Sequence, residues 1–329
     1  MNKRLRLLPL VALLCGCTAS DDGTADAPQG DLRIGFSVET DAAMRAATRT
    51  ATATAFPTDK TFRVYAWDTG NSSWMMDKGT DDDDDSNVVS YDRRRMGWYP
   101  TYAYYWPDND TTVDFYAVYP KDVPFNPESK KIDYTTDAVS GTVDVFYCLT
   151  STSLQDNHYA PAAINFRHAL SRIAFSKEEL NGVTLTVKSI TLQQIKDKGT
   201  FDFSTATWTA SGTDRSFTLD DLDDPTTLDA PTNLDNSLLL MPQTLASGAQ
   251  IVVEYKIQAA NNGAWLHGSD SEWATKTIAL TGDWETGRNY TYTLTADHDI
   301  QLGRVSITDW DNGDSTELEN NGTTTLQQP

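Results

Sequence analysis

Ile164–Phe175 reads INFRHALSRIAF, and this stretch decides how the chain is organised. Its apolar residues predict a buried strand with a short polar break: Ile164, Phe166, Leu170, Ile173 and Phe175. A segment rich in Tyr, Trp and Pro precedes the stretch, and segments rich in Thr, Val and Ile follow it. We therefore interpret it as the seam where one β-domain closes and the next begins. Such a seam builds a scaffold rather than a catalytic site.

Length and composition favour two β-rich domains. A chain of 329 residues is longer than one hydrophobic core usually serves. The apolar fraction of 39%, together with abundant Thr, Asp, Ser and Asn, suits short strands joined by polar turns. The net charge of −21 repels nucleic acid and anionic lipid and favours solubility at a surface. This charge argues against nucleic acid as a partner.

The N-terminus has the features of an export signal. Basic residues in the first six positions precede the apolar run Leu7–Leu14, which is too short to span a membrane. Leu14–Cys17, LCGC, resembles the bacterial lipobox, in which the last cysteine is acylated and becomes the mature N-terminus. We expect a signal peptide over residues 1–16, lipidation of Cys17 and an acidic tether over residues 17–30. An ordinary signal peptide with incidental cysteines is the alternative.

Cysteine usage predicts no disulfide. With Cys17 acylated and the upstream cysteine removed, Cys148 is the one cysteine left in the mature chain. Cys148 lies in the alternating segment 143–149, where a small buried hydrophobic residue is expected rather than a nucleophile.

The first predicted strand is Leu32–Glu39, whose apolar residues alternate with polar ones. An Ala/Thr-rich run with Arg45 and Arg49 follows, as either a weakly amphipathic helix or an exposed loop open to a trypsin-like protease. Thr61–Asp68 predicts another strand. The run Asp81–Asp85 lacks the ligand spacing of an EF-hand loop, so we expect a solvated acidic loop, with adventitious cation binding as the alternative.

The segment Trp98–Pro120, WYPTYAYYWPDNDTTVDFYAVYP, predicts two strands that flank a turn at residues 107–110. In the second strand one face is apolar, at residues 113, 115, 117 and 119. The aromatic residues before the turn could form a glycan-binding platform, although we expect most of them to be core: Tyr99, Tyr102, Tyr104, Tyr105 and Trp106.

The second half predicts further short strands, typical of a sandwich. Alternation at residues 183, 185 and 187 shifts at Ser189, as expected across a β-bulge. Strands are expected around Ile251–Ile257, Ile278–Leu280 and Tyr290–Leu294, and at Val305 with Ile307. Residues 213–242 are expected to form a long loop with one short element at residues 237–241.

No catalytic pattern is found in the sequence. The nucleophile elbow, both Gly-rich phosphate-binding motifs and the C-x-x-C pair are missing. The four histidines show no metal-ligand spacing, and we expect His168 to be a hydrogen-bonded structural residue. We therefore predict no enzyme, no cofactor and no metal site.

Several blocks together resemble the fimbrillin-like (Mfa-like) proteins of type V pili. They are the YYWP–turn–VDFYAVYP block, NFRHALSRIAF, Trp284–Tyr292 (WETGRNYTY) and the closing VSITDW of residues 305–310. The resemblance implies an all-β protein with two tandem transthyretin-like β-sandwich domains after a lipoprotein signal peptide. With the seam, it divides the chain into residues 31–175 and residues 176–329, the latter with a polar tail.

The resemblance also implies an assembly route. In these pili an arginine-specific protease removes the first strand, and a strand from another subunit fills the groove. Here Leu32–Glu39 corresponds to the removed strand, Arg45 or Arg49 to the cleavage site, and Val305 and Ile307 to the donor strand. The polar end of the chain, residues 312–329, is unlike the family's terminal donor strand, which leaves an anchor, cap or accessory role open.

We therefore expect a structural or accessory subunit of a bacterial surface fimbria, anchored to the outer membrane by its lipid, with other fimbrial subunits as partners. The alternative is a surface adhesin that binds a glycan or host protein without polymerising. A glycan-degrading enzyme is the third and weakest reading.

Overall fold

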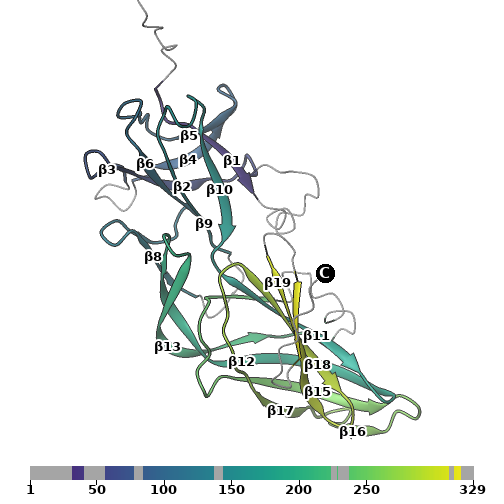
Figure 1. The fold of residues 1–329 in the computed structure, drawn as a ribbon. Coiled ribbons are helices and arrows are strands. Elements are labelled where there is room, and N and C mark those ends of the chain that lie inside the picture. Colours follow the sequence, from purple (N-terminus) through teal and green to yellow (C-terminus); the bar gives the residue numbers. More distant parts are fainter. Residues whose placement is uncertain are drawn as a thin grey trace, which may run out of the picture. The chain divides into compact units, whose positions relative to one another are not determined.

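The computed structural model describes residues 32–40, 56–77, 84–136, 144–223, 228, 237–310 and 315–319. By contacts, the chain divides into Met1–Leu32 and Arg33–Pro329, and every strand lies in the second unit (Figure 1). The described residues are all-β, with strands in three sheets and no helix. No segment within these ranges forms a helix long and apolar enough to cross a membrane.

The N-terminal sheet closes on itself. Its strands run in the order β3-β2-β4-β5-β1-β10-β9-β6, and β6 also pairs with β2. Their bounds are β1 Phe36–Thr40, β2 Phe62–Asp68, β3 Ser73–Met76, β4 Val88–Asp92, β5 Gly97–Pro100, β6 Val113–Tyr119, β9 Phe146–Thr152 and β10 Ala162–His168. Inward-facing aromatic and aliphatic residues fill the space that this sheet encloses.

Two further sheets form the C-terminal part. One has the order β14-β11-β18-β19-β20, with β11 Ser171–Glu179, β14 Ser237–Leu240, β18 Arg288–Ala296, β19 Ile300–Asp309 and β20 Ser315–Glu319. The other has the order β16-β15-β12-β8-β7, with β13 beside β12 and β17 beside β15. Its bounds are β7 Phe125–Asn126, β8 Lys131–Thr135, β12 Val183–Asp202, β13 Thr207–Leu219, β15 Gln250–Ala259, β16 Trp265–His267 and β17 Ala274–Ala279. A common core of buried residues joins β11 and β18 to β12 and β15.

The seam consists of two strands rather than one. β10 ends at His168 in the N-terminal sheet, and β11 begins at Ser171 in the five-stranded sheet. Phe166 is buried against Phe56 and Phe62, whereas Phe175 lies in the other core beside Tyr292. The chain therefore passes from one sheet to another at Ala169 and Leu170, which are both buried.

The predicted β-bulge is confirmed. The pairing of β12 with β15 shifts register between Val187 and Ser189, and Ile190 and Leu192 continue on the buried face. The clean alternation predicted for β15 is also found, with Ile251, Val253, Tyr255 and Ile257 buried.

Three local predictions were wrong. Of the two strands predicted to flank the turn, the first ends at Pro100, well before the turn, and residues 102–106 add a single bridge, between Tyr105 and Arg33. Part of the predicted loop 213–242 is strand, since β13 runs to Leu219 and pairs with β12. β6 is buried on both faces, because Tyr116 and Val118 pack into a third core cluster with Phe203.

Candidate functional site

The first strand, β1, is held unequally at its two edges. It pairs in parallel with β10 over all five of its residues, from Phe36 opposite Ala162 to Thr40 opposite Phe166. Its other edge meets β5 at one pair, Phe36 opposite Trp98. Of the described residues, β1 is therefore fixed mainly through β10.

Side chains of this segment reach into the N-terminal core. Ile34, Phe36 and Val38 are all buried, and the Phe36 ring meets Phe115 edge to face with 5.5 Å between centroids. Three such side chains at about 1.5–3 kcal/mol each contribute roughly 5–9 kcal/mol of burial. The predicted alternation is confirmed for these three, whereas Leu32 is exposed because it lies before the sheet. Loss of β1 would leave an apolar groove and the unpaired edge of β10.

The segment with Arg45 and Arg49 lies outside the described residues. The next described residue is Phe56. It is buried and has ring contacts with Phe62, Trp98 and Phe166 at 5.3–5.5 Å between centroids. Phe56 is therefore an anchor downstream of both arginines, and it would stay in the core after cleavage at either one. A lone Phe after a Thr/Ala run has no periodic signal, so its burial could not be predicted from the sequence.

The predicted donor residues, Val305 and Ile307, lie in β19. They pair with Tyr292 and Tyr290 of β18 on one edge, and β20 pairs along the other edge. Both side chains are partly buried against the C-terminal core. β19 is therefore an inner strand, and β20 is the outer one in the described part of this sheet.

Just beyond β19, Trp310 fixes the end of this strand. Its ring stacks on the His168 ring with 3.7 Å between centroids and an interplanar angle of 5°. The Trp310 amide donates to the Gly287 carbonyl at 2.8 Å, and His168 Nδ1 lies 2.6 Å from an Asp144 carboxylate oxygen. His168 is thus the hydrogen-bonded structural residue that the sequence predicted. The stacking partner could not be predicted, since the two residues are far apart in the sequence.

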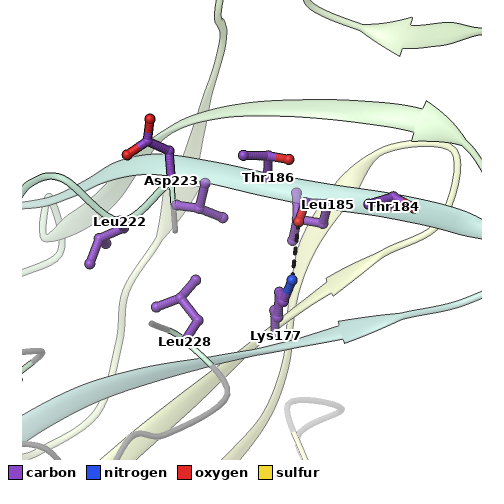
Figure 2. Close-up of a pocket in the computed structure, with 8 residues that line it drawn as sticks. Lys177, Thr184, Leu185, Thr186, Leu222, Asp223 and Leu228 are labelled. Atoms are coloured by element: carbon purple, nitrogen blue, oxygen red, sulfur yellow. Dashed lines mark hydrogen bonds between the residues drawn. The ribbon is translucent and has the colours of Figure 1, made fainter. Parts of the chain in front are cut away.

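The buried thiol of Cys148 and the cavity between β11 and β12 are both poorly suited to catalysis. Burial raises the pKa of Cys148 to about 11, so the thiol stays protonated at neutral pH. Residues of β11 and β12 line a cavity of about 50 Å³, together with Leu222 and Leu228. Figure 2 shows these residues and the hydrogen bond that Lys177 donates to the Leu185 carbonyl. A cavity of this size holds a few water molecules at most.

The acidic run is described only at Asp84 and Asp85; Asp81 to Asp83 lie outside the described residues. Asp85 forms ion pairs with the buried Arg63 at 2.9 Å and with Lys121 at 3.0 Å, and the Lys121 hydrogen bond contributes most to lowering its pKa. The negative charge of Asp85 is thus balanced by the positive charges of Arg63 and Lys121. Nowhere in the described ranges do three or more potential ligands gather as a metal site would require.

The family is decided by a match over most of the chain. The fimbrillin-like family model matches residues 48–310. The chain belongs to the fimbrillin-like family. The match begins after β1 and includes the seam, Trp284–Tyr292 and the closing VSITDW block.

Solved structures share this fimbrillin-like fold. One is described as a candidate cell adhesion protein from Bacteroides ovatus: it is 14% identical, with a TM-score of 0.55, and the match covers 87% of this chain and 100% of that one. Another is a fimbrial protein from Bacteroides vulgatus: it is 16% identical, with a TM-score of 0.54, and the match covers 84% of this chain and 99% of that one. At these identities the likeness shows the fold. No curated protein sequence is significantly similar to the chain.

Proposed function

We propose that this fimbrillin-like chain is a structural or accessory subunit of a bacterial surface fimbria. It is exported as a lipoprotein, with Cys17 as the acylated residue that holds it to the outer membrane. Proteolysis at Arg45 or Arg49 then removes β1, and a strand of another subunit takes its place. A structural role of this kind needs no enzymatic activity.

The unequal pairing of β1 is the observation that carries this proposal. One edge has five backbone pairs and the other has one, so the strand can leave with little disruption of β5. After it leaves, three apolar side chains no longer fill the core and the edge of β10 is unpaired. An incoming strand restores both the burial and the pairing, which makes strand replacement favourable.

The donor is proposed to be the segment around Gly303–Trp310, which covers most of β19 and includes Val305 and Ile307. These two residues have the alternation that the groove requires, because Phe36 and Val38 are spaced in the same way. β20 is the outer strand and would have to leave β19 first. The sequence of β20, STELE, is short and mostly polar, which favours its release.

We further propose two tandem transthyretin-like sandwiches, with residues 31–175 and 176–329 as the domains. The change of sheet between β10 and β11 supports a division near this point, with the sheets themselves changing at Ala169 and Leu170. β7 and β8 are an exception, since they precede the seam in sequence but join the sheet of β12.

The double change Arg45→Ala, Arg49→Ala tests the assembly route. Surface protein of the double variant should retain its full N-terminus and fail to polymerise after treatment with an arginine-specific protease. Arg94→Ala, in an exposed turn of the N-terminal sheet, is the matched control and should polymerise normally. A double variant that still begins near Thr50, or that polymerises as well as the control, would rule out this route.

The second candidate function is an adhesin that does not polymerise. Two of the predicted platform residues favour it, because Tyr102 is 64% exposed and Tyr105 is 56% exposed. Trp106 is instead buried, and Tyr104 packs partly buried against the same core, so the core position expected for most of the five rings holds for these two. Monomeric protein after complete cleavage, together with glycan binding, would favour this function.

A further inference from the structure

Three consecutive arginines are presented by the turn between β4 and β5. Asp92 organises this turn: its carboxylate accepts hydrogen bonds from the amides of Arg94 at 2.8 Å and Arg95 at 3.3 Å. It also forms an ion pair with the Arg95 guanidinium at 2.7 Å. The side chains of Arg93, Arg94 and Arg95 are all exposed.

The ring of Tyr99 lies beside these arginines in a fixed position. The Arg33 guanidinium is 5.3 Å from the ring centroid and the Arg95 guanidinium is 5.5 Å from it. Two glycines leave room for the ring: a Cβ on Gly35 would lie 2.7 Å from Tyr99 Cε1, and one on Gly97 would lie 3.2 Å from Cε2. The ring is therefore seated against backbone and cannot be moved freely.

Together these residues line a surface hollow of about 520 Å³, which also includes the hydroxyl-bearing Ser90 and Thr101. The exposed Tyr102 directly follows the lining residue Thr101, and the exposed Tyr105 forms a backbone bridge to the lining residue Arg33. Guanidinium groups, hydroxyls and aromatic faces are thus gathered on one surface.

The charge of this hollow contrasts with that of the chain. The net charge is −21, yet the hollow is lined by four arginines and one carboxylate, that of Asp92. Within the described ranges, Arg93 and Arg94 form no ion pair with a carboxylate. At physiological salt, charges beyond about 8 Å are largely screened, so a small anion would meet mainly the arginines.

We propose that this hollow, the arginine–tyrosine hollow, binds an anionic saccharide. The guanidinium groups would hold its sulfate or carboxylate groups through charge-assisted hydrogen bonds, and the tyrosine rings would contact its apolar ring faces. A short oligosaccharide fits better than a long polyanion, which the −21 charge would repel. The site does not depend on polymerisation. Removal of β1 with the residues before it would take away Arg33 and Gly35, whereas Arg93, Arg94, Arg95 and Tyr99 would remain.

The test is calorimetric titration of the full chain with a sulfated heparin tetrasaccharide and with trigalacturonate, each against neutral cellotetraose. The triple variant Arg93→Gln, Arg94→Gln, Arg95→Gln should weaken binding about tenfold or more, since one charge-assisted hydrogen bond corresponds to roughly a factor of ten in Kd. Tyr99→Leu should weaken binding of both anionic probes with the charge unchanged.

The matched control is a second triple variant, Lys60→Gln, Lys198→Gln, Arg304→Gln, which removes three exposed cations elsewhere. It should bind like the unmodified chain. If the arginine triple variant has an altered melting curve, the single variant Arg94→Gln replaces it in the titration, and it should also weaken binding.

Several results would overturn the proposal. Equal weakening by both triple variants would show a general charge effect rather than a site. Binding of a hexaglutamate peptide as tight as that of the saccharides would assign the hollow to an acidic protein segment. No binding of either anionic saccharide would refute the proposal outright.

Discussion

Phe36→Ala should destabilise the unprocessed chain and have no effect once β1 has been removed. Phe36 is 1% exposed, meets Phe115 edge to face and pairs with both β10 and β5. Replacing such a ring by Ala costs about 3–5 kcal/mol, from lost burial and from the cavity that remains. For a unit of the size of the N-terminal sheet this corresponds to roughly 6–20 °C in Tm.

The assay is thermal unfolding followed by tryptophan fluorescence, because the buried Trp98 lies opposite Phe36 and reports on this core. Glu39→Ala is the control: its side chain is exposed on the same strand, and it should stay within about 0.5 kcal/mol of the unmodified chain. After arginine-specific cleavage, the Phe36 variant and the unmodified chain should unfold alike. An unprocessed Phe36→Ala chain that melts with the unmodified one would refute the packing of β1. A difference that persists after cleavage would show that β1 does not leave.

Three further predictions follow from the anchor, the thiol and an ion pair. Cys17→Ala should release the protein from the membrane fraction, and a variant that stays acylated and membrane-bound would contradict the lipoprotein proposal. Cys148, whose pKa burial raises to about 11, should react with iodoacetamide only after unfolding; rapid alkylation of the native chain would show an accessible thiol. Hydrogen bonds from Ser204 and then Lys131 lower the pKa of Asp202 from 3.8 to about 2, so its stabilisation is present above about pH 4 and lost as pH falls through 2. Asp202→Asn should remove that part of the acid dependence, and an unchanged acid unfolding curve would refute this contribution.

The regular strands could be predicted because their signal is local. The slip in alternation at Ser189 is visible in the sequence, and it marks the bulge that the structure contains. Ile34, Phe36 and Val38 likewise identify β1 by their period of two. Both signals depend on one face of a strand being apolar.

Features that depend on distant residues could not be predicted in this way. β6 shows an apolar face in the sequence, but Tyr116 and Val118 on its other face are also buried, against residues such as Phe203. β13 has exposed polar residues over most of its length and forms through pairing with β12. For the proposed strand-exchange site, the sequence predicts β1 and the cleavage-site residues Arg45 and Arg49. The weak edge toward β5 and the anchor at Phe56 come from tertiary pairing.

The departure of β1 is the central claim, and a reversible clamp tests it most directly. Ser37 and Ala163 are register partners on β1 and β10, and both side chains are exposed. Neighbouring strands lie about 4.8 Å apart, within the Cα spacing that a disulfide bridges. The double variant Ser37→Cys, Ala163→Cys should therefore hold β1 in place after arginine-specific cleavage, with the fragment still attached on a non-reducing gel. We predict that the cleaved, oxidised variant stays monomeric and polymerises once a reductant is added, while each single variant polymerises in both conditions. Polymerisation of the oxidised, cross-linked variant at the rate of the reduced one would contradict the proposal that a second subunit replaces β1.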